Sequence, residues 1–208
     1  MICVPLGALL EDSVSCLRAA GLDVSPLEDA GRRLVVDAAD GTRYITTRPS
    51  DVPIYVEAGA ADLGIVGRDV LREHAPNVYE ILDLGFGNCR MIYATPDGDD
   101  PTADALAHLG AVRVATKYPA IARRHFAATG RAVEVVKVNG SVELAPLVGL
   151  AHGIVDLTAT GRTLRENGLV EREQILTSTA RLIANRVSHK VSAGAVDQLI
   201  ARLETGMP

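Results

Sequence analysis

The sequence predicts an α/β protein of two lobes, in which one lobe is discontinuous and a ligand cleft lies between the two. Short apolar runs alternate with helical patterns along most of the chain, as is typical of sheets covered by helices. The core must consist mainly of Val, Leu, Ile and Ala, because the 208 residues include two Phe, five Tyr and no Trp. The last strand and helix are too few to form a domain alone, so we expect them to pack on the first lobe.

The first half of the chain alternates between strand and helix patterns. The apolar run at residues 2–6 predicts a strand, and the periodic segment at residues 10–20 predicts a helix. Residues 33–47 predict a hairpin that turns at Asp40 and Gly41. The same patterns predict strands at residues 61–67, 80–87 and 89–96 and helices at residues 50–59 and 68–74.

The second half alternates more regularly. We expect strands at residues 111–116, 132–138, 153–157 and 174–185, and helices at residues 118–130, 141–153, 163–169 and 192–206. The last helix is amphipathic, with an apolar side formed by Val196, Leu199, Ile200 and Leu203. The Pro, Gly and Asp cluster at residues 96–110 indicates a crossing between lobes. We therefore expect one lobe at residues 94–177 and the other at residues 1–93 plus 178–208, with the ligand between them.

Composition excludes several classes of protein. The net charge of −5 and the lack of a long Lys/Arg run argue against nucleic-acid binding. Cys3, Cys16 and Cys89 are widely spaced, and the five His lack metal-ligand spacing, so we expect neither disulfides nor a protein-held metal. Pro5 and Gly7 interrupt the first apolar stretch, and no apolar run approaches the ~18 residues of a membrane helix. We expect a soluble, cytoplasmic protein without a membrane partner.

The stretch at residues 153–169 carries the clearest chemistry. Asp156 follows a buried strand and so stands at the carboxyl edge of the sheet, where ligands bind in α/β folds. Thr158, Thr160 and Thr163 supply hydroxyl groups, and Gly161 lets the backbone approach a ligand closely. A helix starts near Thr163, and its free N–H groups suit an anion. A carboxylate beside a phosphate is tolerated where it faces a sugar diol or a metal, so a phosphorylated sugar fits. The alternative is an ordinary turn, with Thr163 as helix cap and Asp156 as a turn residue.

Other turns resemble this one in shape. Gly67 ends a predicted strand and Asp69 lies in the first turn of the next helix, while Glu143 lies near the start of a later helix. A tight strand-to-helix connection explains each of them without a ligand. Lys117 and Arg90 add positive charge at strand ends, and their significance depends on meeting at one edge.

Four segments taken together resemble ATP phosphoribosyltransferase: residues 48–71, 115–119, 139–169 and 184–190. The resemblance extends over nearly the whole chain, and the segment at residues 139–169 is its most specific part. It implies two periplasmic-binding-protein-like lobes of type II. It also implies transfer of the phosphoribosyl group of phosphoribosyl pyrophosphate to N1 of ATP, which gives phosphoribosyl-ATP and pyrophosphate in the first step of histidine biosynthesis. The Mg²⁺ that this reaction uses would be carried by the substrate phosphates.

The resemblance also implies roles for individual residues. Asp156 would meet the ribose hydroxyls, while catalytic Arg48, together with Arg32 or Arg33, would lie near the pyrophosphate or triphosphate. The ribose 5-phosphate would be held by the loop of Thr158, Ala159, Thr160, Gly161, Arg162 and Thr163. The walls of the ATP and sugar site would include Gly67, Asp69, Arg90 and Glu143.

The chain departs from the family pattern in two respects. It lacks the C-terminal regulatory domain of the long form, so it is similar to short-form catalytic subunits, which form homodimers and assemble with a histidyl-tRNA-synthetase-like regulatory subunit. The family usually has Lys and Arg at the positions of Leu6 and Ala8, so two cations expected beside a polyphosphate are missing. That loss supports an alternative function, a non-catalytic two-lobed module that binds a phosphorylated ligand.

Overall fold

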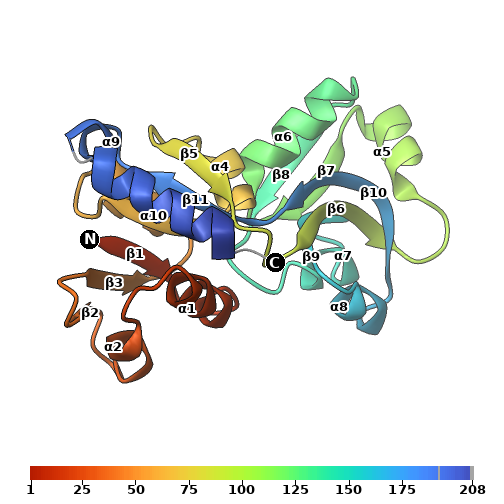
Figure 1. Cartoon of the computed structure of the whole chain (residues 1–208). Helices are drawn as coiled ribbons and strands as arrows, with labels where there is room; N and C mark the ends of the chain where they lie inside the picture. Colours follow the sequence, from red (N-terminus) through yellow and green to blue (C-terminus); the bar gives the residue numbers. More distant parts are fainter. Residues whose placement is uncertain (192, 207–208) are drawn as a thin grey trace. The chain divides into compact units, whose positions relative to one another are not determined.

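The computed structural model describes residues 1–191 and 193–206. The chain divides into two compact units, one formed by Met1–Asn88 with Thr179–Pro208 and the other by Cys89–Ser178. We call these the first unit and the second unit. Each contains one sheet with helices packed on it (Figure 1), so the mixed α/β class predicted from the sequence is confirmed.

The sheet of the first unit has the strand order β2-β3-β1-β4-β11-β5. Strand β1 pairs in parallel with β3 and β4, whereas β11 runs antiparallel to β4 and β5, and β2 runs antiparallel to β3. The strands are β1 (Ile2–Pro5), β2 (Val35–Asp37), β3 (Arg43–Thr47), β4 (Leu63–Gly67), β5 (Tyr79–Asp83) and β11 (Ala180–Ala184). The carboxyl ends of β1 and β3 therefore lie together at one edge of this sheet, and the predicted hairpin is confirmed as β2 and β3.

Helices cover both faces of this sheet. They are α1 (Leu10–Ala19), α2 (Ser25–Glu28), α3 (Val52–Glu57), α4 (Arg68–His74), α9 (Arg186–Val191) and α10 (Ala193–Gly206). Helices α1 and α10 contribute Leu17, Val196 and Leu203 to the core on one face. Helices α3 and α4 contribute Val56 and Val70 to the core on the other. The predicted apolar side of the last helix is confirmed, since Leu199 and Ile200 also pack against the first of these cores.

The sheet of the second unit has the strand order β10-β6-β9-β7-β8. Strand β7 pairs in parallel with β8 and β9, and β6 runs antiparallel to β9 and β10. The strands are β6 (Cys89–Pro96), β7 (Val112–Thr116), β8 (Val133–Lys137), β9 (Gly153–Thr158) and β10 (Leu169–Ser178). Strand β9 thus occupies the middle of the sheet, and its last residues lead into the stretch that the sequence marks as a ligand site.

Two helix pairs cover this second sheet: α5 (Pro101–Leu109) and α6 (Pro119–Ala128), and α7 (Leu144–Leu147) and α8 (Arg162–Glu166). On one face Ala105 and Phe126 pack against Met91 and Tyr93. On the other, Leu164 packs with a group of apolar residues that includes Ile92, Ala94 and Ala145. Alternate residues of β6 therefore serve opposite faces, as the pleat of a strand requires.

Three sequence expectations were wrong. The segment at residues 96–110 is no simple crossing, because Asp100 caps helix α5 by accepting a hydrogen bond from the Thr102 N–H over 2.9 Å. The helix expected at residues 141–153 is reduced to α7, four residues long. The single strand expected at residues 174–185 is divided at Thr179, with β10 in one sheet and β11 in the other. Propensity alone does not show where a strand leaves one sheet for another.

The three cysteines are free thiols. No helix in residues 1–191 or 193–206 is both long and apolar enough to cross a membrane.

Candidate active site

Asp156 lies beside Lys117 at one edge of the second sheet. Thr116 of β7 pairs in parallel with Val155 of β9, so the residues that follow them in the two strands are neighbours. Asp156 is half-buried, and its Oδ1 accepts a hydrogen bond from the Leu157 N–H over 2.9 Å. Asp156 and Lys117 therefore lie at the same edge of the sheet.

The environment of Asp156 disfavours its charge. Burial raises the pKa of the Asp156 carboxyl above its ordinary value, and the negative charge of Glu143 raises it further. The hydrogen bond from the Leu157 N–H and the positive charge of Lys117 act in the opposite direction. A carboxylate held in this way is well placed to accept hydrogen bonds from a ligand that brings its own hydroxyl groups.

The loop after β9 is shaped by its own side chains. Gly161 has a φ of +69°, which residues with a side chain rarely adopt. Its N–H donates to Thr158 Oγ1 over 2.8 Å, and the Arg162 N–H donates to Thr160 Oγ1 over 3.3 Å. Within the described part of the chain, the backbone N–H groups of Thr160 and Thr163 donate to no other atom. The loop therefore offers free backbone donors to an anion.

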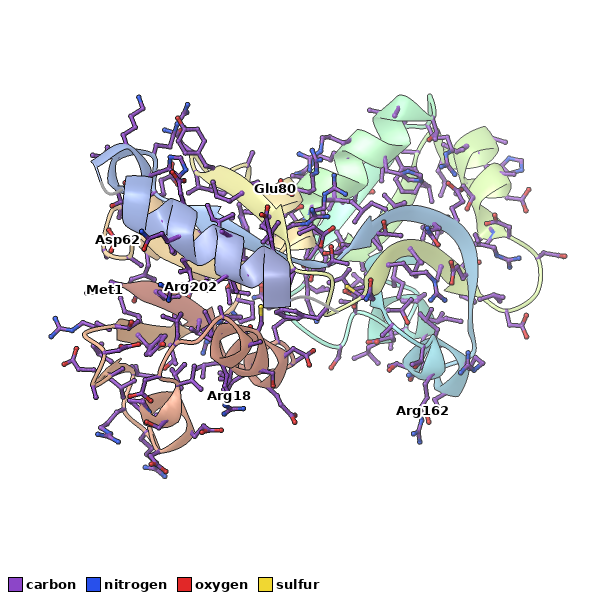
Figure 2. All side chains as sticks on the ribbon, viewed as in Figure 1. Met1, Arg18, Asp62, Glu80, Arg162 and Arg202 are labelled. Carbon is purple, nitrogen blue, oxygen red and sulfur yellow. The ribbon has the colours of Figure 1, made fainter. Side chains whose placement is uncertain are left out.

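The start of helix α8 decides between two interpretations of Thr163. The helix begins at Arg162. Its cap residue is Gly161, which has no side chain that could cap the helix. Thr163 is therefore inside the first turn and does not cap the helix, so that part of the ordinary-turn alternative is wrong. The Arg162 side chain extends outward from α8 (Figure 2), is 78% exposed and pairs with Glu166 over 2.7 Å.

Two arginines hold the carbonyl groups of this loop. Arg90 donates from Nη1 to the Ala159 carbonyl over 3.1 Å, and Arg165 donates from Nη1 to the Thr160 carbonyl over 3.1 Å. Arg90 also donates from Nε and Nη2 to the Glu171 carboxylate, with a shortest distance of 2.8 Å. Arg90 thus contacts the loop rather than standing free beside it.

Glu143 lies in the turn before α7. It is the cap residue of that helix, with no side-chain cap hydrogen bond, and Ser141 two residues earlier does not cap it. Ser141 instead has a φ of +44° and accepts a hydrogen bond from the Leu144 N–H at its carbonyl. The Glu143 side chain is half-buried and close enough to Asp156 to affect its pKa.

Gly67 and Asp69 form a compact turn in the first unit. Gly67 is the cap residue of helix α4, and the Asp69 side chain, 6% exposed, folds back over it. A Cβ added at Gly67 would overlap the Asp69 carboxylate. A larger residue at position 67 would therefore displace the Asp69 side chain, whether or not a ligand binds.

The arginines assigned to the pyrophosphate are exposed in the first unit. Arg48 follows β3, whose Thr47 pairs with Pro5 of β1, so Arg48 and Leu6 leave the same edge of the sheet. Arg33 donates from Nη2 to the Asp29 carbonyl over 2.7 Å and is thus occupied within its own turn. Arg32 is also exposed and makes no such bond within the described residues, so of the two adjacent arginines it is better placed to meet a ligand.

The predicted residues form two groups, one in each unit. The second unit contains Arg90, Glu143, Asp156 and the loop from Thr158 to Thr163, and the first unit contains Arg32, Arg48, Gly67 and Asp69. We call these groups the phosphate half-site and the arginine half-site. No group of three or more His, Cys, Asp or Glu side chains in either unit, as far as the chain is described, is arranged to hold a metal.

Two residues that contact the phosphate half-site were missed from the sequence. Arg165 lies four residues after Gly161, so its helical spacing was a usable signal. Glu171 lies on β10, and only the strand pairing brings it to Arg90.

The sequence model of the family described as ATP phosphoribosyltransferase matches residues 48–205. An ATP phosphoribosyltransferase of Rubrobacter xylanophilus is 54% identical over 201 residues, which cover 96% of this chain and 93% of that protein. One of Sorangium cellulosum is 50% identical over 203 residues, covering 97% and 93%. Both half-sites contain residues within the matched range.

Solved structures agree with these relatives. The ATP phosphoribosyl transferase (HisG:HisZ) complex of Thermotoga maritima contains a chain of the same fold, with a TM-score of 0.84, 30% identity, and 99% and 97% of the two chains covered. The periplasmic aliphatic sulphonate binding protein SsuA of Escherichia coli has a TM-score of 0.58 at 9% identity, covering 99% and 71%. The second likeness concerns the fold alone, and it confirms the predicted periplasmic-binding-protein-like class.

Proposed function

Because the chain belongs to the ATP phosphoribosyltransferase family, we propose that its phosphate half-site binds the ribose 5-phosphate part of phosphoribosyl pyrophosphate. The chain is an enzyme that transfers the phosphoribosyl group of phosphoribosyl pyrophosphate to N1 of ATP. The products are phosphoribosyl-ATP and pyrophosphate, and the reaction is the first step of histidine biosynthesis.

The loop after β9 is the observation that carries this assignment. Free backbone donors at Thr160 and Thr163 suit the 5-phosphate, and Asp156, near the end of the same strand, suits the ribose hydroxyls. Phosphate and diol are the two ends of one ribose 5-phosphate, so a single substrate satisfies both features. The positive charges of Arg90 and Arg165 at the loop carbonyls favour an anion there.

We assign the leaving pyrophosphate to the arginine half-site. Arg48 and Arg32 are exposed and have planar guanidinium groups that bind phosphate oxygens in pairs. Arg48 also leaves the sheet beside Leu6, where the family has a lysine, so its charge replaces part of what is lost there. Gly67 and Asp69 then belong to the wall that meets ATP.

The chemistry requires no general base. N1 of adenine has a lone pair, which forms the new bond to C1 of the ribose while the bond from C1 to the pyrophosphate oxygen breaks. The barrier is lowered by holding the two substrates in line and by cations that stabilise the departing pyrophosphate. Mg²⁺, carried by phosphate oxygens and water, would screen the same charge, and it needs few ligands from the protein.

We further propose a short-form assembly in the cytoplasm. The chain would form a homodimer and bind a histidyl-tRNA-synthetase-like regulatory subunit. The name of the Thermotoga maritima complex, which pairs two kinds of chain, supports a hetero-oligomer. Co-elution of the purified chain with such a subunit, at a mass above that of either alone, tests the assembly.

A steady-state assay for phosphoribosyl-ATP tests the proposal as a whole. The chain is supplied with ATP, phosphoribosyl pyrophosphate and Mg²⁺, with and without the regulatory subunit. We expect turnover that stops when EDTA removes the metal. Binding of phosphoribosyl pyrophosphate without turnover under both conditions would instead favour the non-catalytic binding module.

A further inference from the structure

Strand β10 contains an irregularity beside the phosphate half-site. Glu171 pairs with Ala94 of β6 and Glu173 pairs with Tyr93, so Arg172 is an extra residue between two neighbouring pairs. Ala94 and Tyr93 are consecutive and face opposite sides of the sheet. The bulge therefore places Glu171 and Glu173 on opposite faces, although residues two apart in a regular strand share one face.

Arg172 fixes the position of this bulge. It donates from Nε to Thr95 Oγ1 over 2.8 Å and from Nη2 to the Gly98 carbonyl over 2.7 Å. These bonds tie the extra residue to the end of β6 and to the segment that follows it. Glu171, which pairs with Ala94, lies on the face that carries α7 and α8.

On that face the Glu171 carboxylate accepts hydrogen bonds from two nitrogen atoms of Arg90. The Arg90 Nε donates over 3.1 Å and Nη2 over 2.8 Å to the same carboxylate, and both side chains are 31% exposed. This pairing also raises the pKa of Arg90. Charge-assisted pairs that are bidentate and partly buried fix orientation as well as position. The guanidinium is thus turned so that its third nitrogen, Nη1, meets the Ala159 carbonyl over 3.1 Å.

Glu173 offers a natural comparison on the opposite face. Its carboxylate accepts hydrogen bonds from Arg131 over 2.5 and 2.7 Å, and it contacts His125 Nε2 over 2.8 Å. The Arg131 guanidinium stacks over the Phe126 ring at 4.6 Å. This pair has similar chemistry and burial but no contact with the loop at residues 158–163.

We propose that Glu171 is a positioning residue for the phosphate loop, which it controls through Arg90. When the carboxylate holds the guanidinium, the Ala159 carbonyl is bonded to Arg90, and the loop is held with its free N–H groups at Thr160 and Thr163 ready for a phosphate. Without Glu171, Arg90 turns to solvent and the loop samples other conformations. The ligand in this inference rests on the proposed function, whereas the control of the loop does not.

The test compares Glu171→Gln with Glu173→Gln in the full-length chain. Each change removes one charge from an arginine-paired glutamate, on the same strand and at similar exposure. Backbone hydrogen exchange of peptides covering residues 158–164 is measured without ligand. We expect exchange there to be faster in Glu171→Gln and unchanged in Glu173→Gln.

Binding and steady-state kinetics with phosphoribosyl pyrophosphate then show how a more mobile loop affects the substrate. We expect the Kd and KM for phosphoribosyl pyrophosphate to rise about tenfold in Glu171→Gln, while kcat changes less than about twofold. In Glu173→Gln both constants stay at their wild-type values, although its melting temperature falls. A residue with a merely structural role would not produce this difference between KM and kcat.

A second variant tests the same contact from the arginine side, in case Glu171→Gln does not fold. Arg90→Lys keeps the charge, but a single ammonium group does not span Glu171 and the Ala159 carbonyl. It should speed exchange in the loop as Glu171→Gln does, and the double variant should be no faster than either single one. Wild-type exchange in Glu171→Gln, or equal acceleration in Glu173→Gln, would overturn the inference. If the wild-type chain binds no phosphoribosyl pyrophosphate, the proposed function fails, and the exchange data still decide the role of Glu171.

Discussion

Replacing Asp156 by Asn separates what this residue contributes to the reaction from what its charge costs the fold. Burial raises the pKa of Asp156, so its ionised form is less favourable in the folded chain than in the unfolded one. Asparagine keeps the oxygen that accepts the Leu157 N–H but carries no charge. We therefore expect Asp156→Asn to lose activity while its free energy of unfolding stays the same or increases.

The expected sizes of the two effects differ. A hydrogen bond between a carboxylate and a sugar hydroxyl contributes about 1.5–3 kcal/mol. The kcat/KM for phosphoribosyl pyrophosphate should therefore fall by about 10- to 150-fold in Asp156→Asn. The gain in stability should be smaller than this loss. It is limited because Lys117 and the Leu157 N–H already offset part of the cost of burying the charge.

The pH dependence gives an independent check. A carboxyl whose folded pKa is raised destabilises the fold above that pKa, where it must be ionised. The cost disappears as the pH falls below the ordinary value of 3.8, because the group is then protonated in both states. The stability gain of Asp156→Asn should thus be present at a pH of about 7.5 and absent at a pH of about 3.

Urea unfolding at both pH values and steady-state kinetics measure these quantities. Asp99→Asn, which removes an exposed carboxylate of the same unit, serves as the matched control. Wild-type kcat/KM in Asp156→Asn would exclude a role in binding the ribose. A lower free energy of unfolding at neutral pH would refute the electrostatic reasoning, because it would mean that the charge stabilises the fold.

Three further changes have defined outcomes. Leu6→Lys combined with Ala8→Arg should raise turnover or lower the KM for ATP, since it restores two cations at the sheet edge, and no change in either constant would show that they are not needed. Gly153→Ala should lower the free energy of unfolding by about 1–3 kcal/mol in urea, because its Cβ would lie 2.7 Å from the Ala94 carbonyl oxygen. Glu173→Gln should cost about 1–2 kcal/mol at neutral pH. Arginine lowers the pKa of Glu173, so its stabilisation is lost as the pH falls below 4.5, and the variant should then match the wild type.

The alternation of apolar runs was a sound guide to the strands. Strands β1, β4, β6 and β7 lie where short buried runs predicted them, because each is enclosed by helices and so carries few polar residues. Helix α7 was overestimated, since the apolar pattern at residues 141–153 continues past Gly149, which has a φ of +73°. The apolar pattern shows which residues face the core, but it does not show where the helical backbone ends.

The candidate site was predictable only where function lies in consecutive residues. The loop from Thr158 to Thr163 is one short segment, so its donors and its glycine stand together in the sequence. Glu171 reaches Arg90 from 81 residues away, and the two meet because β10 and β6 are neighbouring strands of the folded sheet. No period in the sequence shows which strands become neighbours, and none marks the bulge at Arg172.

The bulge at Arg172 also bears on how relatives of this chain should be aligned. A relative that lacks this residue would have a regular strand in which Glu171 and Glu173 become adjacent. Adjacent residues of a strand face opposite sides, so both glutamates would keep their present faces and partners. A one-residue gap at this position is therefore neutral for the phosphate loop, whereas a gap placed between Glu171 and Leu169 would move Glu171 away from Arg90. The position of a gap in this strand thus decides whether a relative is inferred to have the same contact between Glu171 and Arg90.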